Sequence, residues 1–219
     1  MDIQFSMKIR LIIFDLWSTL IYTGYPEAIH NIAMILGFPD DTSFWNFCDN
    51  EWLCTKESAG EFFSRVCSFR HLSKDTLNRV LELWNESQKR VRMYSDVIPF
   101  LEMLSETYKL VIVSNTSCDE AEHAIKSFGL DKYFDDIILS CDVGIVKPNP
   151  KIFQIALDRF NVKASEALLI GDDLKKDIIP ARSIGLNAIL LDRKGKYPEY
   201  EGNDWYVKSL KEIEIGRFC

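Results

Sequence analysis

Three polar side chains follow apolar runs that have the character of buried strands, two of them directly and the third after one glycine. The three pairs are Ile9–Phe14 with Asp15, Leu110–Val113 with Ser114, and Ala167–Ile170 with Asp172. In open α/β sheets, ligands bind at the carboxyl ends of parallel strands, so these side chains are expected to meet at one edge of a sheet. A buried carboxylate is costly unless it is paired or coordinates a cation, which indicates that Asp15 has a partner there.

Two predicted helix starts add positive potential at the same edge. Ser117-x-x-Glu120 has the spacing of a capping box, and the N–H groups in the first turn of that helix attract anions. Asn149-Pro150 is typical of a helix start with proline at its first position, and it brings Lys147 to the beginning of a second helix. The sequence therefore predicts that a hydroxyl, a cation and a helix dipole converge on an anion.

The two carboxylates Asp15 and Asp172 suit a hard divalent cation such as Mg²⁺, which prefers oxygen ligands. With Lys147 they fit phosphoryl transfer, which uses a carboxylate nucleophile, a metal ion that neutralises charge and a cation that stabilises the transition state. Each residue alone also has an ordinary interpretation, because aspartates after strands commonly cap helices or occupy turns. Their joint occurrence at strand ends favours an active site.

These segments resemble the four motifs of the haloacid dehalogenase-like (HAD) hydrolase superfamily, and the resemblance covers nearly the whole chain. In that family the first motif has two aspartates two positions apart, and the second ends a strand in Ser or Thr. The third supplies a lysine, and the fourth is Gly-Asp with a further Asp five residues on. The corresponding segments are Asp15-Leu16-Trp17-Ser18-Thr19-Leu20, Val111-Ile112-Val113-Ser114-Asn115, Gly144-Ile145-Val146-Lys147-Pro148-Asn149-Pro150 and Gly171-Asp172-Asp173-Leu174-Lys175-Lys176-Asp177.

The resemblance implies a role for each matched position. Asp15 would be the nucleophile and would form an aspartyl intermediate, while Asp15, the backbone carbonyl of Trp17 and Asp172 would hold Mg²⁺. The phosphoryl group and the rest of the substrate would be bound by Ser114, Asn115, Lys147 and Trp17. Asp173 and Asp177 would lie one layer further out, with Asp177 orienting Lys147 or a metal-bound water.

Trp17 departs from the family's phosphatases, in which the second aspartate of the first motif is the general acid and base. An indole cannot take that role, because its N–H is a donor that does not titrate near neutrality. General acid–base catalysis contributes about 10²–10⁴-fold. A phosphatase with Trp17 is therefore expected to be slow, or confined to esters whose leaving groups need no proton.

Two alternatives remain open from the sequence. The haloacid dehalogenase branch places an aromatic residue at this position and expels a halide without a metal. That branch, however, replaces the fourth-motif Gly-Asp and holds the substrate carboxylate with an arginine early in its cap, whereas this chain retains Asp172 and has no arginine between Trp17 and Arg65. The other alternative is a HAD-fold binding protein without useful turnover.

The fold expected is α/β, a parallel-sheet Rossmann-like HAD core with an inserted α-helical cap of the subfamily I type. The core is assigned to residues 1–21 and 94–219 and the cap to residues 22–93, because apolar residues recur there at helical spacing. Strands alternate with helices after the cap, which indicates a parallel sheet covered on both faces. Expected strands are 8–16, 109–113, 137–139, 167–170, 188–191 and 205–207; expected helices are 26–36, 44–54, 60–68, 75–93, 97–106, 118–128, 150–160, 178–184 and 210–213.

Composition narrows the partners. The chain has 219 residues, a net charge of −7 and a pI near 5.1, without a basic stripe, so nucleic acid is not expected as a partner. The family resemblance implies a small phosphorylated molecule as the substrate. Neither a signal peptide nor a membrane span fits, Met1–Ser6 is expected to be a frayed leader, and a cytoplasmic location is expected. Oligomeric state stays open. The six cysteines form no C-x-x-C pair and are expected to be free thiols.

Two further interpretations concern the cleft. The run Arg193-Lys194-Gly195-Lys196 is interpreted as a solvated turn. Trp17, Tyr22 and Tyr25 are expected to line a cleft between cap and core, since they leave the first strand directly. The aromatic stripe of the helical segment is interpreted as cap core: Phe44, Trp45, Phe47, Trp52, Phe62 and Phe63.

Overall fold

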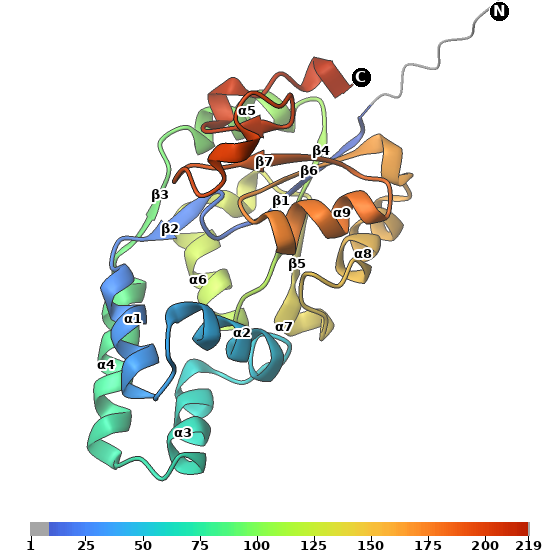
Figure 1. Ribbon diagram of the computed structural model, residues 1–219. Helices are drawn as coiled ribbons and strands as arrows, with labels where there is room; N and C mark the ends of the chain where they lie inside the picture. The colour runs from blue at the N-terminus through green and yellow to red at the C-terminus, as the bar shows by residue number, and fades with distance from the viewer. Residues whose placement is uncertain (1–8, 219) are drawn as a thin grey trace, which may run out of the picture.

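A computed structural model describes residues 9–218 and contains a six-stranded, fully parallel sheet (Figure 1). The strand order β5-β4-β1-β6-β7-β8 places β1 at the centre, between β4 and β6. The α/β fold expected from the sequence is confirmed. The strands are β1 (Leu11–Phe14), β4 (Lys109–Ser114), β5 (Asp136–Leu139), β6 (Ala167–Gly171), β7 (Asn187–Leu191) and β8 (Tyr206–Val207).

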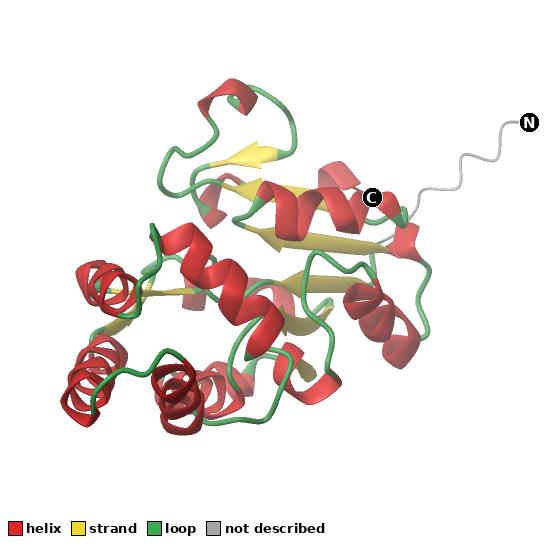
Figure 2. Ribbon diagram, turned by 60° about the horizontal axis from the view of Figure 1, so that its bottom comes forward, coloured by secondary structure: helices red, strands yellow, loops and turns green. Residues whose placement is uncertain are grey.

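Both faces of this sheet are covered by helices, which explains why its strands read as continuous apolar runs (Figure 2). On one face Ile12 and Phe14 pack against α5 (Val97–Ser105) and α6 (Cys118–Ser127). On the other face Leu11 and Ile13 pack with α8 (Lys151–Phe160) and α9 (Ile179–Ser183).

Four helices between β1 and β4 surround a core of their own and lie together at the lower left of Figure 1. Asp40, Ser58 and Ser73 each cap a helix of this unit by accepting a hydrogen bond from a backbone N–H three residues on. Phe44, Trp52, Phe62 and Phe63 are fully buried, as expected for the aromatic stripe. The helices are α1 (Pro26–Ile35), α2 (Asp41–Glu51), α3 (Ala59–Phe69) and α4 (Lys74–Lys89), called here the helical unit.

The predicted helix over 75–93 is wrong at its end. Helix α4 stops at Lys89, and β3 (Val91–Met93) pairs antiparallel with β2 (Ile21–Thr23). The ribbon is closed by Gly24, whose N–H donates to the carbonyl of Arg90; a Cβ on Gly24 would lie 2.7 Å from that oxygen. The chain therefore enters and leaves the helical unit through one two-stranded ribbon.

The shorter elements differ from expectation mainly in length. The predicted helix 178–184 begins as a π-helical turn (Leu174–Ile178) before α9, and 210–213 is a 3₁₀ turn (Leu210–Glu212). A short helix α7 (Ser140–Val143) was not predicted. The remaining 3₁₀ turns are Leu130–Lys132, Ala164–Glu166, Pro198–Tyr200 and Ile215–Phe218. Within residues 9–218, every helix is too short or too polar to traverse a bilayer. Met1–Ser6 lies outside the described residues.

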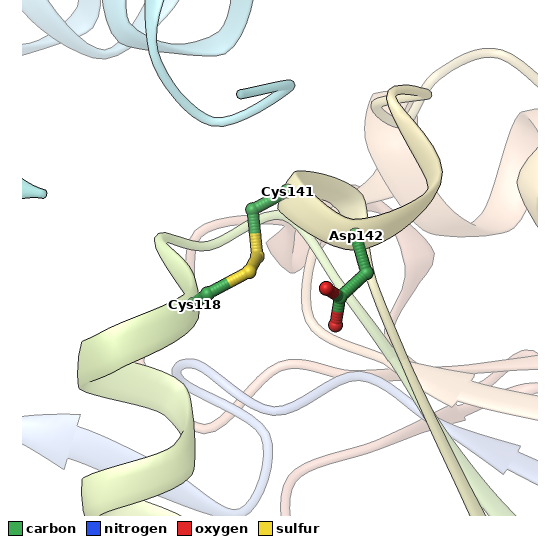
Figure 3. A group of neighbouring side chains, drawn as sticks. All are labelled: Cys118, Cys141 and Asp142. Atoms are coloured by element: carbon green, nitrogen blue, oxygen red, sulfur yellow. A yellow bond between two sulfur atoms is a disulfide. The ribbon is translucent and has the colours of Figure 1, made fainter. Parts of the chain in front are cut away.

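The expectation of free thiols is wrong for one pair. Cys118 and Cys141 form a disulfide that joins the start of α6 to α7, with a Cα–Cα distance of 5.7 Å (Figure 3). Strands β4 and β5 are neighbours, and Ser114 pairs with Leu139, so the residues that follow the two strand ends lie close together. Cys48, Cys54 and Cys67 are free, and Cys219 lies outside the described residues. The cytoplasmic location stays a prediction.

Candidate active site

The ends of three adjacent strands bring together the first residues singled out in the sequence. Strand β1 pairs with β4 on one side and β6 on the other, and Phe14 stands opposite both Ile112 and Ile170. Asp15, directly after Phe14, therefore lies between the carboxyl end of β4, which carries Ser114, and that of β6, which leads into Asp172. Asp15 is only 5% exposed.

Lys147 is buried between two carboxylates. Its Nζ donates to Asp15 Oδ1 at 2.6 Å and to Asp177 Oδ1 at 2.7 Å. Burial disfavours the ammonium, but the charges of the two carboxylates outweigh burial and raise the pKa of Lys147. Burial also raises the pKa of Asp15, an effect that Lys147 opposes and the charge of Asp172 reinforces. Lys147 is thus the group that keeps Asp15 available as an anion.

Asn115 fastens the lysine to the end of β4. Its Oδ1 accepts from the Lys147 backbone N–H at 2.7 Å, and its Nδ2 donates to the Lys147 carbonyl at 2.9 Å. Nδ2 also donates to Asp49 Oδ1, on α2, at 3.0 Å. The amide of Asn115, expected to bind substrate, is therefore committed to holding Lys147 in place.

The Ser114 hydroxyl is fully buried and has no hydrogen-bond partner within residues 9–218. A buried hydroxyl without a partner costs about 1–3 kcal/mol, so a ligand that accepted from it would recover stability. Ser114 itself does not line the cavity that lies between the sheet edge and the helical unit, whereas the next three residues, 115–117, do.

The segment after β6 is shaped by close packing around Asp177. A Cβ on Gly171 would lie 2.6 Å from the Asp177 carboxylate, so only glycine fits there. Asp173 Oδ1 caps the turn that follows by accepting from the N–H groups of Lys175 and Lys176. The N–H of Asp173 donates to Asp177 Oδ2 at 3.1 Å, which fixes that carboxylate toward Lys147.

The basic run after β7 is an exposed turn, as interpreted, but two of its side chains contact carboxylates of the core. Lys196 Nζ contacts Asp172 Oδ2 at 2.7 Å, and Arg193 forms two hydrogen bonds with the Asp96 carboxylate. The Arg193 guanidinium also lies over the ring of Tyr94, 3.9 Å from its centroid. These contacts were not predicted because Asp96 and Asp172 lie far from the run in sequence.

The carboxylates at this edge fit a divalent cation. Oxygens of Asp15, Asp172 and Asp177 lie within 4.8 Å of one another. Two ammonium groups face these three carboxylates: Lys147, which is buried, and Lys196, which is exposed to solvent. The carboxylates thus outnumber the ammonium groups that contact them. An all-oxygen donor set with excess negative charge is the type that Mg²⁺ prefers. A second group of donor atoms, Cys118, Cys141 and Asp142, carries no thiolate because its sulfurs are bonded to each other (Figure 3).

Trp17 lies in the wall of a cavity of about 380 Å³ between the sheet edge and the helical unit. Its Nε1 donates to Thr116 Oγ1 at 3.0 Å, which fixes the indole. Tyr22 lines the same cavity, as expected. Tyr25 does not: it packs on the helical unit with the Arg90 guanidinium over its ring, so that expectation is wrong.

Several residues of this cavity were missed in the sequence. Asp49 and Lys176 form an ion pair that joins α2 to the turn after β6. Glu120, on α6, accepts hydrogen bonds from the Trp84 indole of α4 and, at 2.5 Å, from the Ser117 hydroxyl. Burial raises the pKa of Glu120 to about 7. These contacts depend on how the helical unit packs on the sheet, which local spacing does not reveal.

The predicted capping box at Ser117 is absent. The Ser117 hydroxyl caps no backbone N–H of α6 and instead contacts the side chain of Glu120. Glu120 is drawn away from the helix start because Trp84 donates to its other oxygen.

Comparison with known proteins identifies the family. The model of the haloacid dehalogenase-like hydrolases matches residues 12–191, and the chain belongs to that family. A glyceraldehyde 3-phosphate phosphatase of Methanopyrus kandleri is 38% identical over 130 residues, which cover 58% of this chain and 54% of that protein. The matches span about half to two thirds of the length of such curated relatives.

Two solved structures resemble the whole chain. A HAD phosphatase from Thermococcus onnurineus is 27% identical, with a TM-score of 0.63 over 93% of this chain and 95% of that one. A 2-haloacid dehalogenase from Pseudomonas syringae is 25% identical, with a TM-score of 0.67 over 96% and 100%. The chain therefore resembles both a phosphatase and a dehalogenase in fold. The residues of the candidate site, not the fold, must distinguish between these two activities.

Proposed function

We propose that this protein is a Mg²⁺-dependent phosphatase of a small phosphorylated molecule, and that Asp15 is its nucleophile. The proposal is carried by the cluster in which the carboxylates of Asp15, Asp172 and Asp177 lie within reach of one cation and contact the ammonium groups of Lys147 and Lys196. A carbon–halogen hydrolase without a metal has no use for a second carboxylate near its nucleophile, since Asp172 would repel the negative charge of Asp15.

In this proposal Asp15 attacks phosphorus, and the Lys147 ammonium holds the carboxylate and faces the phosphoryl oxygens. Asn115 positions Lys147. The unpartnered hydroxyl of Ser114 is outside the cavity lining and would donate to a phosphoryl group that reached the end of β4. When bound, Mg²⁺ would be held by Asp15, Asp172 and the Trp17 carbonyl and would neutralise negative charge on the phosphoryl oxygens. Asp177 holds the Lys147 ammonium in place, and the backbone N–H of Asp173 holds the Asp177 carboxylate.

Trp17 sets the limits of the activity. Its N–H is engaged with Thr116 and has no acid or base function, so neither departure of the leaving group nor activation of water receives proton transfer from this position. Turnover is expected to be slow, and fastest for esters with good leaving groups.

The second candidate is a carbon–halogen hydrolase, which Trp17 and the similarity to a dehalogenase structure favour. It predicts halide release from 2-chloropropionate without added metal. The first lysine or arginine after Trp17 is Lys56, which pairs with Asp142, and the first arginine, Arg65, contacts Glu57. Neither lines the cavity, so neither could bind a haloacid carboxylate there.

Phosphate release from phosphorylated metabolites and an activated aryl phosphate, with Mg²⁺ and with chelator, tests the proposal. Release that requires Mg²⁺, disappears in Asp15→Asn and rises in Trp17→Asp is expected. Wild-type protein that releases no phosphate in any condition, but releases halide from 2-chloropropionate, would replace this function with the second candidate.

A further inference from the structure

The cavity has two chemically different walls. The wall at the strand ends carries the charged groups around Asp15, whereas the wall formed by the helical unit and the segment after β1 presents aromatic and aliphatic side chains among polar ones. The ring and aliphatic side chains on this second wall are Trp17, Tyr22, Ile29, Trp45, Trp84 and Val91. Whatever is attached to the phosphoryl group must lie against this surface.

Two of the indoles have no hydrogen-bonding capacity left for a ligand. Trp17 Nε1 donates to Thr116, and Trp84 Nε1 donates to Glu120. An indole has this single donor and no acceptor. Both rings therefore offer a substrate only their apolar surface, which suits a flat, unsaturated group by stacking or edge contact.

Two polar side chains of the helical unit in this cavity are also engaged with the protein. Asp49 accepts from Asn115 and pairs with Lys176, and the Ser87 hydroxyl donates to the Trp84 carbonyl. These two groups therefore compete less for hydrogen bonds with a substrate than free side chains would.

The absence of an acid at Trp17 also favours an aromatic leaving group. Without a proton donor, the oxygen that leaves phosphorus must depart as an anion. A phenol has a pKa of roughly 10, whereas an alcohol resembles water, with a pKa near roughly 15.7. A phenolate is therefore a far better leaving group here than an alkoxide.

We propose that the substrate is a phosphate monoester of an aromatic hydroxyl, with its ring held against Trp17, Trp45 and Trp84. This inference rests on the proposed phosphatase function. An Asp15 oxygen bonds to phosphorus while the bond between phosphorus and the aryl oxygen breaks, and the electron pair departs with the phenolate. Water then attacks phosphorus, which releases inorganic phosphate and restores the Asp15 carboxylate; the proton lost by water is taken up by the phenolate or by solvent.

Phenyl phosphate and cyclohexyl phosphate form a matched pair of similar size and equal charge that tests this inference. We expect kcat/KM to be at least about 10²-fold higher for phenyl phosphate in the wild type, and the gap to narrow in Trp17→Asp, which supplies an acid. Equal kcat/KM for the two esters would overturn the inference and leave phosphatase activity in place. No phosphate release from either ester, with or without Mg²⁺, would overturn the proposed function itself.

Binding tests the aromatic wall separately from turnover. Calorimetry on Asp15→Asn should show tighter binding of phenyl than of cyclohexyl phosphate. A further Trp45→Leu change should reduce that preference about 3- to 10-fold, whereas Trp45→Phe, which retains a ring, should keep most of it. Phe69→Leu, at an aromatic residue that is 84% exposed and outside the cavity, is the control. Equal affinity for the two esters, or a preference unchanged in Trp45→Leu, would contradict the placement of the ring.

Discussion

The contacts of a single lysine organise the chemistry at this site. Lys147 is 3% exposed and joins Asp15 to Asp177, so its charge is balanced inside the protein rather than by water. Breaking a buried pair by removing one partner typically costs about 3–5 kcal/mol, because a charge is left uncompensated. The same contacts that position Asp15, the proposed nucleophile, therefore hold the strand ends together.

A partly buried acid in the cavity wall, Glu120, makes stability depend on pH. Its pKa is raised to about 7 by burial, above the ordinary 4.5. The folded protein then binds more protons than the unfolded chain between these values, so the free energy of unfolding falls as pH rises through this window. The contribution amounts to up to about 3 kcal/mol.

Glu120→Gln should remove this part of the pH dependence, since the amide oxygen can still accept from Trp84 and the amide nitrogen can donate to Ser117. Denaturant titrations from pH 4.5 to 8 measure it as the difference between variant and wild type. Glu122→Gln, at an exposed position of the same helix, is the matched control. A slope that is the same in Glu120→Gln and in the wild type would show that Glu120 does not titrate in this window.

At this scale the sequence predicted the strand-end residues well and their partners poorly. Asp15, Ser114 and Asp172 could be placed because an apolar run followed by a polar residue is a local pattern. Lys147 beside Asp15 came from the family resemblance. Lys196 on Asp172 could not be found, because nothing near a short basic run shows which carboxylate it will meet after folding.

Among the elements, α6 and the short helix α7 are joined by a covalent bond. The disulfide between Cys118 and Cys141 closes a segment with a sequence separation of 23. Both helices follow strands that carry or flank the site, since β4 ends in Ser114 and the chain after α7 leads to Lys147. The bond restricts the chain between the two parts of the site that would contact the phosphoryl group.

Reduction of this disulfide should lower the free energy of unfolding by about 3 kcal/mol, the loop-closure value for a segment of this length. Cys141→Ser should show the same loss and become insensitive to reductant, whereas Cys54→Ser, at a free cysteine, should behave like the wild type. Denaturant titrations with and without dithiothreitol measure the difference. Equal stability with and without reductant would show that the bond contributes nothing to folding.

Helices and strands were predicted correctly where one hydrophobic pattern, either a continuous apolar run or a three- to four-residue spacing, continued without interruption. The parallel strands and most helices of the helical unit fall into this class. The end of α4 was missed because Val91–Met93 also suits a helix by composition, and only its pairing with Ile21–Thr23 makes it a strand. The disulfide was missed because it depends on the register of β4 with β5, which the sequence does not display.

At the scale of the whole molecule, the cavity is formed by the packing of the helical unit against the edge of the sheet. The ion pair of Asp49 with Lys176 and the hydrogen bond from Trp84 to Glu120 cross this boundary. The sheet edge supplies the charged groups and the helical unit supplies most of the apolar surface. In the proposed function, the sheet edge would carry out phosphoryl transfer and the helical unit would contact the leaving group.

In the proposed reaction, Trp17 leaves phosphoryl transfer to Asp15 intact when the leaving group is good. Trp17 slows the second step, the hydrolysis of the aspartyl phosphate, because it supplies no base. Rapid mixing of the Mg²⁺-loaded enzyme with 4-nitrophenyl phosphate measures this directly. We predict a burst of about one nitrophenolate per active site, followed by slow turnover. The burst should disappear in Asp15→Asn and shrink in Trp17→Asp, whose new base speeds the second step. Release that is linear from the first turnover in the wild type, or a burst that persists in Asp15→Asn, would contradict the account.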